Sequence, residues 1–362
     1  MARVLVGMSG GVDSAVAAKV LIDAGHQVAG VTLSLVPSIG AIRDASGAQS
    51  RTCCSLEDVQ AARETCYRLG IEHFVFNFRD AFVECVMRPF VDSYLAGETP
   101  NPCVECNRLV KFGKLIERAR LLGYDFLATG HYARISRSES GRYLLRRGAD
   151  AAKDQSYVLY PLTQDQLSAT MFPLGEMTKS QVRAIAAEAG FASANKPESQ
   201  DICFVPDGDY AGFIERYAPG SVRPGDFVDL GGKPVGRHRG VVRYTIGQRR
   251  GIAVAFGKPT YVVAKDAEAN TVTLGSDEDL RAKTVIARDT NLVSLARIEG
   301  SVRVTAKIRY NQTDQPATVR ARGDGRVLVE FDEPQRAVAP GQSVVFYDGD
   351  VVVGGGIIAG TA

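Results

Sequence analysis

The sequence contains no apolar run approaching the roughly 20 residues that a membrane-spanning helix needs. Its N-terminus lacks a basic segment followed by a long apolar stretch, so we expect no secretory signal. The seven cysteines are odd in number and cannot all pair in a simple disulfide framework. We therefore expect a cytoplasmic protein whose cysteines stay reduced, and we expect some of them to take part in chemistry.

Length and composition indicate a soluble globular protein with more than one domain. The 362 residues are 45% hydrophobic and 23% charged, which is ordinary for such proteins. A chain of this length is too long for one compact core, so we expect two or three domains. The net charge of +2 is uninformative without its distribution.

Up to about residue 205, short β-rich runs alternate with helical segments, which predicts an α/β fold with a parallel sheet. We expect strands at residues 3–7, 28–35, 73–78 and 125–129. Helices are expected near residues 56–69, 81–95, 110–122 and 178–190, and Thr178 and Gln181 have the spacing of a capping box. From about residue 222, short β runs separated by glycines and turn pairs predict smaller β domains of barrel composition.

Residues 7–14, G-M-S-G-G-V-D-S, follow the apolar run Val4-Leu5-Val6 and lead into a helical segment. Adjacent glycines allow the backbone to approach an anion closely, and the helix N-terminus adds partial positive charge. The loop lacks the Lys of a P-loop and the third Gly of a dinucleotide fingerprint, so we expect neither γ-phosphate transfer nor NAD. The pattern S-G-G-V-D-S resembles the pyrophosphate loop of ATP pyrophosphatases, which implies ATP and Mg²⁺ as cofactors. The alternative is an ordinary glycine-rich turn between a strand and a helix.

Two cysteine-containing segments lie far apart in the sequence. The first is N-P-C-V-E-C-N at residues 101–107, and the second is S-Q-D-I-C-F at residues 199–204. A C-x-x-C motif alone indicates a redox pair or half of a metal site, but no second C-x-x-C and no H-x-x-x-H follows it. Buried structural cysteines are the alternative, and we favour that interpretation for Cys53, Cys54, Cys66 and Cys85.

These segments and several others together resemble the tRNA-specific 2-thiouridylase family. The further motifs are K-D-Q-S-Y at residues 153–157, R-Y-N-Q at 309–312, P-G-Q at 340–342 and G-G-G at 354–356, so the resemblance spans the chain. It implies a Rossmann-like ATP-pyrophosphatase catalytic domain over residues 1–205, a central tRNA-binding domain over 206–280 and a C-terminal β-barrel domain over 281–362. It also implies an ATP-dependent sulfurtransferase that adenylates C2 of the wobble uridine in tRNA and replaces the oxygen by sulfur, giving 2-thiouridine.

The resemblance implies that two cysteines carry the sulfur. Cys203 would hold a persulfide, supplied by a sulfur donor such as a cysteine desulfurase or a sulfur-carrier protein, and Cys106 would be the partner thiol. A persulfide delivers its outer sulfur only if the S–S bond is then broken, which a second thiolate can do. The product would be a Cys106–Cys203 disulfide bond that needs reduction.

The family's binding residues correspond to further positions in this sequence. The residues implied to bind ATP are Gly7, Met8, Ser9, Gly10, Gly11, Val12, Asp13, Ser14, Leu33 and Gly130. The residues implied to contact tRNA are Asn101, Pro102, Cys103, His131, Lys153, Asp154, Gln155, Arg309, Tyr310 and Gln342. For Leu33 and His131 the alternative is an ordinary core residue.

Cys103 departs from the family pattern, because many members have Asp at this position with an acid or base role near the target base. Cys103, Cys106 and Cys203 would together supply three thiolates, enough to hold three irons of a [4Fe–4S] cluster. We favour the persulfide route over the cluster and predict no other metal site.

Acidic residues are missing from residues 231–258, which contain seven cations. These are Lys233, Arg237, Arg239, Arg243, Arg249, Arg250 and Lys258, with His238 among them. Such a stretch predicts a surface that follows nucleic-acid phosphates, and a solvated basic face is the alternative. A second basic stretch, tempered by Glu139, consists of Arg134, Arg137, Arg142, Arg146 and Arg147.

Two other functions are weighed against the thiouridylase. A pyrophosphate-loop ligase acting on a small metabolite would explain residues 7–14, but it explains neither the acid-free basic stretch nor the two distant cysteine segments. A non-catalytic RNA-binding protein with a metal held by Cys103 and Cys106 would explain the charge and leave the loop unused.

Overall fold

The computed structural model describes residues 1–362 except 37–55, 196–201, 253, 255–256 and 258. Cys53, Cys54 and Lys258 lie outside the described residues. The chain forms two compact units. The first comprises Met1–Val86, Cys103–Gly208 and Asp350–Val352, and the second comprises Met87–Pro102, Asp209–Gly349 and Val353–Ala362. Within the described ranges, no helix is long and apolar enough to cross a membrane.

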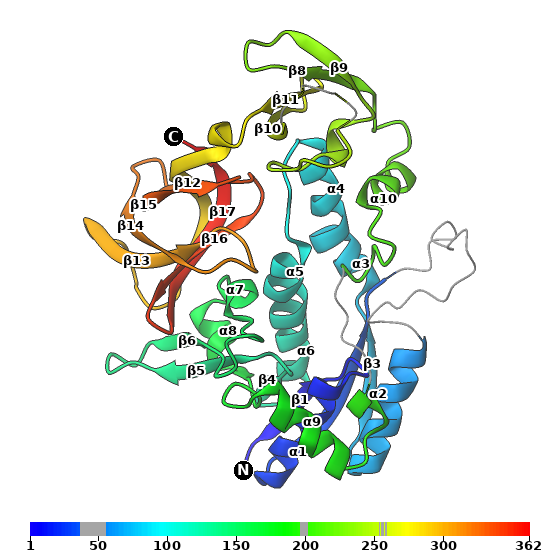
Figure 1. Ribbon diagram of the computed structural model, residues 1–362. Helices are drawn as coiled ribbons and strands as arrows, with labels where there is room; N and C mark the ends of the chain where they lie inside the picture. Colours follow the sequence, from blue (N-terminus) through cyan, green and yellow to red (C-terminus); the bar gives the residue numbers. More distant parts are fainter. Residues whose placement is uncertain (37–55, 196–201, 253, 255–256, 258) are drawn as a thin grey trace. The chain divides into compact units, whose positions relative to one another are not determined.

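The first unit contains a five-stranded parallel sheet with the order β3-β2-β1-β4-β7 (Figure 1). Its strands are β1 (Arg3–Gly7), β2 (Gln27–Ser34), β3 (His73–Asn77), β4 (Phe126–Ala128) and β7 (Thr170–Met171). The first four confirm the predicted strands to within a residue or so at each end. The two residues of β7 are too short to give a sequence pattern.

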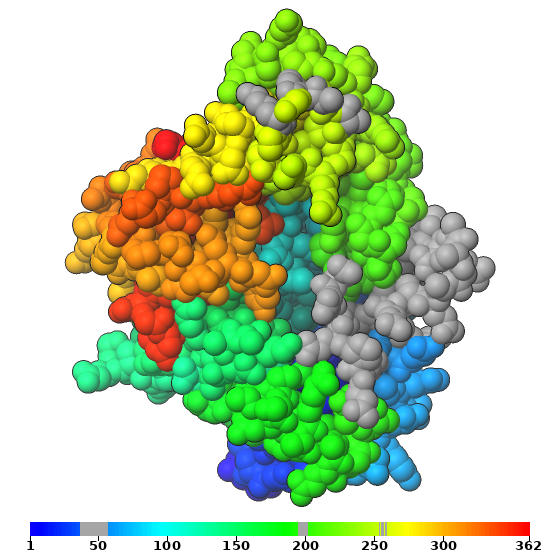
Figure 2. Space-filling model, in the orientation of Figure 1, coloured from blue at the N-terminus to red at the C-terminus, as the bar shows by residue number. Residues whose placement is uncertain are grey.

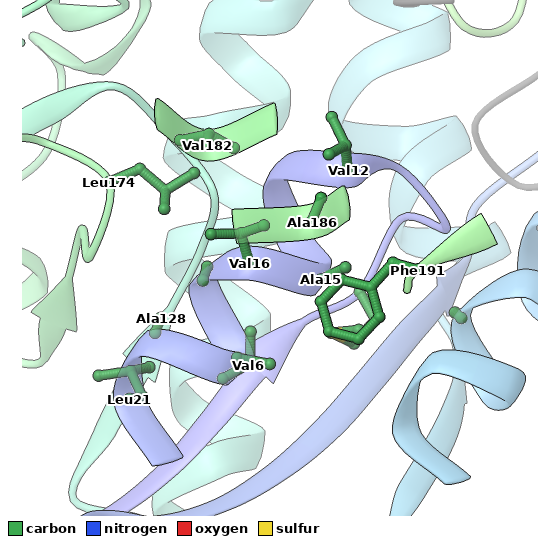
Figure 3. Close-up of a cluster of buried hydrophobic side chains, with 14 of the residues drawn as sticks. Val6, Val12, Ala15, Val16, Leu21, Ala128, Leu174, Val182, Ala186 and Phe191 are labelled. Carbon is green, nitrogen blue, oxygen red and sulfur yellow. The ribbon is translucent and has the colours of Figure 1, made fainter. Parts of the chain in front are cut away.

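Three helices complete the core of this unit, namely α1 (Val12–Asp23), α2 (Leu56–Leu69) and α9 (Lys179–Glu188). Val6 of β1, Val16 of α1 and Val182 of α9 are fully buried members of one hydrophobic cluster (Figure 3). The predicted capping box is confirmed, because the Thr178 side chain accepts from the Gln181 backbone and Gln181 accepts from the Thr178 backbone. The packing of α9 against α1 brings the first turns of both helices to the same end of the sheet.

The two predicted helices at 81–95 and 110–122 are each divided, and both contain π-helical turns. The first consists of α3 (Arg79–Phe82), the π-helix η1 (Val83–Met87) and α4 (Arg88–Leu95). The second begins earlier than predicted and consists of α5 (Pro102–Glu105), the π-helix η2 (Cys106–Lys114) and α6 (Leu115–Leu121). Apolar periodicity does not distinguish a π-helical turn from an α-helical one over a few residues, because both bury one face.

A β-hairpin and two short helices complete the first unit. The hairpin joins β5 (Ala133–Arg137) to β6 (Tyr143–Arg147), and the helices are α7 (Ser156–Leu159) and α8 (Gln164–Ser168). Arg134 and Arg146 of the hairpin bind the two oxygens of Asp350, each at 2.8 Å. Within the second basic stretch, these two arginines therefore form ion pairs with a residue of the same chain. Their charge is used inside the protein and is not presented as a phosphate-binding surface.

The second unit contains two β structures. The strands β8 (Gly225–Val228), β9 (Pro234–His238), β10 (Tyr261–Asp266) and β11 (Thr271–Gly275) form a four-stranded sheet, which α10 (Tyr210–Tyr217) precedes. The remaining strands β12 (Arg281–Leu292), β13 (Ser301–Lys307), β14 (Gln315–Ala321), β15 (Val327–Arg336), β16 (Ser343–Asp348) and β17 (Val351–Thr361) close into a barrel through pairing of β12 with β17 (Figure 1). The predicted fold class, an α/β unit with a parallel sheet followed by smaller β structures, is confirmed.

Candidate active site

The loop after β1 is held by its own serines and leaves the start of α1 without a side-chain cap. Ser14 Oγ donates to the Gly11 carbonyl at 3.0 Å and accepts from the Ser9 backbone at 3.2 Å. Gly11 is the N-cap of α1 and its helix start has no side-chain hydrogen bond. Backbone N–H groups at such a helix start are donors for a phosphate.

Glycine is required at Gly10 because of the backbone around it. Gly10 has φ +70°, and a Cβ there would lie 2.6 Å from the Asp58 carbonyl oxygen. Any side chain would therefore push the loop away from α2. The sequence prediction assigned these glycines to the approach of an anion, and the contact with α2 is a further requirement for glycine that it did not include.

Two polar side chains on β2 and β3 support the loop through hydrogen bonds. Thr32 Oγ1 donates to the Met8 carbonyl at 2.9 Å and lies 2.8 Å from His73 Nε2. Because the hydroxyl proton points to Met8, His73 Nε2 must carry the hydrogen of the second bond. Burial, together with the charge of Arg63, lowers the pKa of His73 below its ordinary value, so this histidine is neutral at neutral pH.

The carboxylate of Asp13 lies at the centre of the site. Tyr132 donates its hydroxyl to Asp13 Oδ1 at 2.7 Å, and Lys179 Nζ lies 2.7 and 2.8 Å from the two carboxylate oxygens. Sequence reasoning missed both partners. One signal was available for Lys179, because a cation at the first residue of a helix opposes the helix dipole and therefore suggests a role outside the helix.

Gly130 and His131 follow β4, and Gly130 lies against Asp13. A Cβ on Gly130 would lie 2.8 Å from the Asp13 carbonyl carbon and 2.9 Å from Asp13 Cβ, so the first turn of α1 approaches Gly130 as closely as a bare backbone allows.

His131 is buried between Phe112 and Phe172, and its Nδ1 lies 2.6 Å from Thr129 Oγ1. Burial lowers the pKa of His131 to about 3, so it supplies no positive charge to a phosphate. Leu33 is half-buried on β2.

The cysteine segment runs from α5 into the π-helix η2. Cys103 is exposed on α5, whereas Cys106 is buried at the first residue of η2. The side chain of Asn107 donates to the Val158 carbonyl at 3.1 Å, and Gln166 donates to the Arg108 carbonyl at 2.9 Å. These two bonds attach the start of the π-helix to α7 and α8, so the position of Cys106 depends on both short helices.

Cys203 lies half-buried in the first unit, directly before a buried aromatic contact. Phe204 packs edge-on against Phe82 with ring centroids 5.7 Å apart, and Val205 donates to the Ile202 carbonyl at 2.9 Å. The rest of the predicted motif before it, residues 199–201, lies outside the described residues.

The described residues form no group of side chains arranged around a single metal ion. Over the parts of the chain that the structure describes, no group of three or more His, Cys, Asp or Glu residues could hold a metal ion. Cys103, Cys106 and Cys203 are described and belong to this search. We therefore derive no step through a cluster.

Three protein-family signatures match the chain in order. They are described as a tRNA methyl transferase HUP domain over residues 2–207, a tRNA methyl transferase PRC-barrel domain over 211–276 and an aminomethyltransferase beta-barrel domain over 282–358. Relatives named tRNA-specific 2-thiouridylase MnmA match over nearly the whole length. The protein from Moorella thermoacetica is 51% identical over 99% of both chains, and that from Acetivibrio thermocellus is 49% identical over 98% of this chain and 99% of its own. The chain belongs to the tRNA-specific 2-thiouridylase family. The predicted family resemblance is confirmed.

Among the positions that the sequence analysis predicted to contact tRNA, Asp154 and Gln155 have internal partners. Asp154 accepts from the backbones of Gly148 and Ser156 at 3.1 and 3.0 Å. Gln155 Oε1 accepts from the Tyr132 backbone at 3.0 Å. These contacts hold the turn that carries the half-buried Lys153 against the backbone of Tyr132.

In the second unit, Gln342 holds the segment that precedes the cysteines. Its side chain donates to the Thr99 carbonyl at 2.7 Å, and the neighbouring Glu98 binds Arg288 through both carboxylate oxygens at 2.8 and 2.9 Å. Asn101 is half-buried and Pro102 is buried. The chain is therefore anchored to the barrel a few residues before Cys103.

Arg309 and Tyr310 lie at the surface of the second unit. Arg309 is exposed, and its guanidinium donates to the carbonyls of Arg336, at 2.9 Å, and Ala337. Tyr310 is 38% exposed. Both positions are accessible to a large ligand.

The described cations of residues 231–258 are exposed, and one of them forms an ion pair with an acidic residue from outside the stretch. Arg237 lies 3.4 Å from Asp226 in an exposed ion pair. His238 is buried, accepts from the Gly240 backbone at 3.0 Å and lies 3.1 Å from the Asn270 carbonyl. Burial lowers its pKa below the ordinary value, so His238 is a structural residue. Lys233 and Arg239 flank β9, Arg243 ends the short 3-10 helix η4 (Val241–Arg243), and Arg249 and Arg250 follow it. This stretch of the chain is yellow-green in Figure 2.

We predict that Gly130→Ala weakens ATP binding by about tenfold or more, because its methyl group would displace the Asp13 backbone. Gly360→Ala is the matched control, since a Cβ there meets nothing within 4 Å. Isothermal titration calorimetry with ATP measures the effect. Equal affinities for the two variants would contradict the proposed closeness of Gly130 to the nucleotide site.

Proposed function

We propose that this protein is a tRNA 2-thiouridylase, which activates C2 of the wobble uridine with ATP and replaces its oxygen by sulfur. The observation that carries the proposal is the similarity to relatives named tRNA-specific 2-thiouridylase over nearly the full length of both chains. The uncapped loop at the start of α1 and the location of Cys106 and Cys203 in the same unit as that loop support it. We further propose a cytoplasmic location, where thiols stay reduced.

Adenylation requires the loop to receive pyrophosphate. The uracil O2 forms a bond to the α-phosphorus of ATP, the bond from that phosphorus to its bridging oxygen breaks, and the electron pair leaves with pyrophosphate. The N3 proton of the uracil passes to water. Backbone N–H groups at the uncapped start of α1 would bind the departing anion. Oxygen donors on Asp13 and Ser9 are of the kind that Mg²⁺ prefers, and the ion would neutralise charge on the phosphates.

Sulfur transfer follows on the activated carbon. The outer sulfur of a Cys203 persulfide attacks C2, and AMP leaves with the former uracil oxygen. The Cys106 thiolate then attacks the inner sulfur, which releases 2-thiouridine and leaves a Cys106–Cys203 disulfide. An external thiol reductant restores both thiols, and a persulfide-bearing donor protein reloads Cys203.

tRNA binding is proposed to use both units. In the second unit the exposed Lys233, Arg239, Arg243, Arg249 and Arg250 supply cations for phosphates. A wobble base reaches an active site only when it is unstacked from the anticodon loop, so contacts on several elements are required. In the first unit, the turn that carries Lys153 is held against Tyr132, which supports a contact there.

Pyrophosphate release distinguishes this function from its two rivals. A thiouridylase releases pyrophosphate from ATP only when its tRNA is present. A ligase for a small metabolite would release none in response to bulk tRNA, and a non-catalytic RNA-binding protein would release none under any condition.

We predict that Cys203→Ser separates the two half-reactions. Because activation precedes sulfur attack, this variant should release pyrophosphate with tRNA and form no 2-thiouridine, measured by mass spectrometry of the digested tRNA. Cys85→Ser, at a half-buried cysteine outside these motifs, should thiolate normally. Normal thiolation by Cys203→Ser would refute the persulfide assignment.

Replacing Arg249 and Arg250 by Gln should weaken tRNA binding and reduce the slope of log affinity against log salt by about one unit for each phosphate that is no longer neutralised. Replacing Arg322 and Arg326, which lie beside Asp324, removes the same charge and should change neither quantity. Filter binding across a salt series provides the measurement. Unchanged binding by the first pair would mean that these cations form only a solvated face.

Cys103→Asp restores the carboxylate found in many family members and should retain substantial thiolation. In the persulfide route the protein purified without oxygen should work from a persulfide donor without stoichiometric iron, measured by metal analysis alongside thiolation. Activity that arises only after iron–sulfur reconstitution, and that Cys103→Asp abolishes, would replace the persulfide route by a cluster.

A further inference from the structure

Lys179 is held in an unusual place. It is the first residue of α9, and its backbone N–H donates to Asp150 Oδ2 at 2.9 Å. Its side chain is only 12% exposed and reaches the loop after β1, where Nζ meets both oxygens of Asp13. The ammonium also lies 5.7 Å from the centre of the Tyr132 ring. Both ends of the side chain are therefore fixed.

The ion pair is poorly explained as a stabilising contact. Removing two charges from water costs about as much as their attraction returns, so an apolar pair of similar size is often as stable. A lysine at the start of α9 also opposes that helix's dipole. The arrangement instead places a compact cation with three N–H donors directly against a loop built to receive an anion.

We propose that Lys179 is a pyrophosphate-binding residue, and that Asp13 holds its ammonium in position until ATP enters. This inference rests on the proposed adenylation. When the β- and γ-phosphates occupy the loop, the ammonium exchanges contact with Asp13 for contact with phosphate oxygens. It then stabilises the negative charge that grows on the leaving pyrophosphate as the bond to the α-phosphorus breaks. Tyr132 keeps Asp13 oriented during the exchange through its hydroxyl.

The proposal predicts which ligands depend on Lys179. ATP and pyrophosphate carry the phosphates that the ammonium would contact, whereas AMP does not. Lys179→Met should weaken binding of ATP and of pyrophosphate by about tenfold to a hundredfold, as loss of a charged hydrogen bond does. AMP binding should change by less than about twofold on the same reasoning. A merely structural loss at the loop would weaken all three together.

A double variant keeps the test decisive if Lys179→Met disturbs folding by leaving Asp13 without its cation. Asp13→Asn with Lys179→Met removes both charges and restores neutrality, and titration in magnesium-free buffer excludes any effect of losing Asp13 as a magnesium ligand. If Lys179 served only to neutralise Asp13, the double variant would recover pyrophosphate binding relative to Lys179→Met alone. If Lys179 contacts phosphate, the double variant should bind pyrophosphate no better than Lys179→Met. Lys19→Met, which breaks the exposed pair of Lys19 with Asp23 on α1, is the matched control and should bind all three ligands normally.

Isothermal titration calorimetry of the full chain with ATP, sodium pyrophosphate and AMP measures these affinities without tRNA or a sulfur donor. Selective loss of ATP and pyrophosphate binding in Lys179→Met and in the double variant would support the proposal. Equal loss of AMP binding, or recovery in the double variant, would overturn it and leave the proposed function intact. A wild-type protein that binds neither ATP nor pyrophosphate would overturn the proposed adenylation as well.

Discussion

The Asp13 carboxylate joins the loop after β1 to the rest of the first unit. It lies in the first turn of α1 and receives a hydroxyl from the segment after β4 and an ammonium from the start of α9. Gly130 approaches the same residue so closely that a methyl group would not fit. Because three separate parts of the chain meet at one carboxylate, removing it would leave Lys179 without its main counter-charge, at a cost on the order of a few kcal/mol.

The cysteines depend on a different set of contacts. Cys106 begins a π-helix whose first residues are attached to α7 and α8 by Asn107 and Gln166. The segment before Cys103 is fixed to the barrel through Glu98 and Thr99. The loop proposed for adenylation and the cysteine proposed for sulfur transfer are thus held by separate hydrogen-bond networks.

The features predictable from the sequence were those whose physical cause is local. The glycine-rich loop, the capping box of Thr178 and the strand pattern each arise within a few residues. The contact of Lys179 with Asp13 spans 166 residues and that of Arg134 with Asp350 spans 216, so neither leaves a local signal. The sequence left the burial of His131 open as an alternative and gave no sign that His238 is buried, since a lone histidine carries no periodicity. The positive charge of both basic stretches is visible in the sequence. The ion pairs that Asp226 forms with the first stretch and Asp350 with the second depend on the fold.

The first unit acquires its last residues from the far end of the chain. Asp350–Val352 belongs to it, with Asp350 accepting from Arg134 and Arg146 and Val351 pairing with Arg146, while the rest of β17 closes the barrel. During synthesis from the N-terminus, the hairpin of β5 and β6 therefore emerges about 200 residues before its acidic partner. The nucleotide-binding unit cannot be completed as an isolated early folding product, and its final ion pairs form only when nearly the whole chain has left the ribosome.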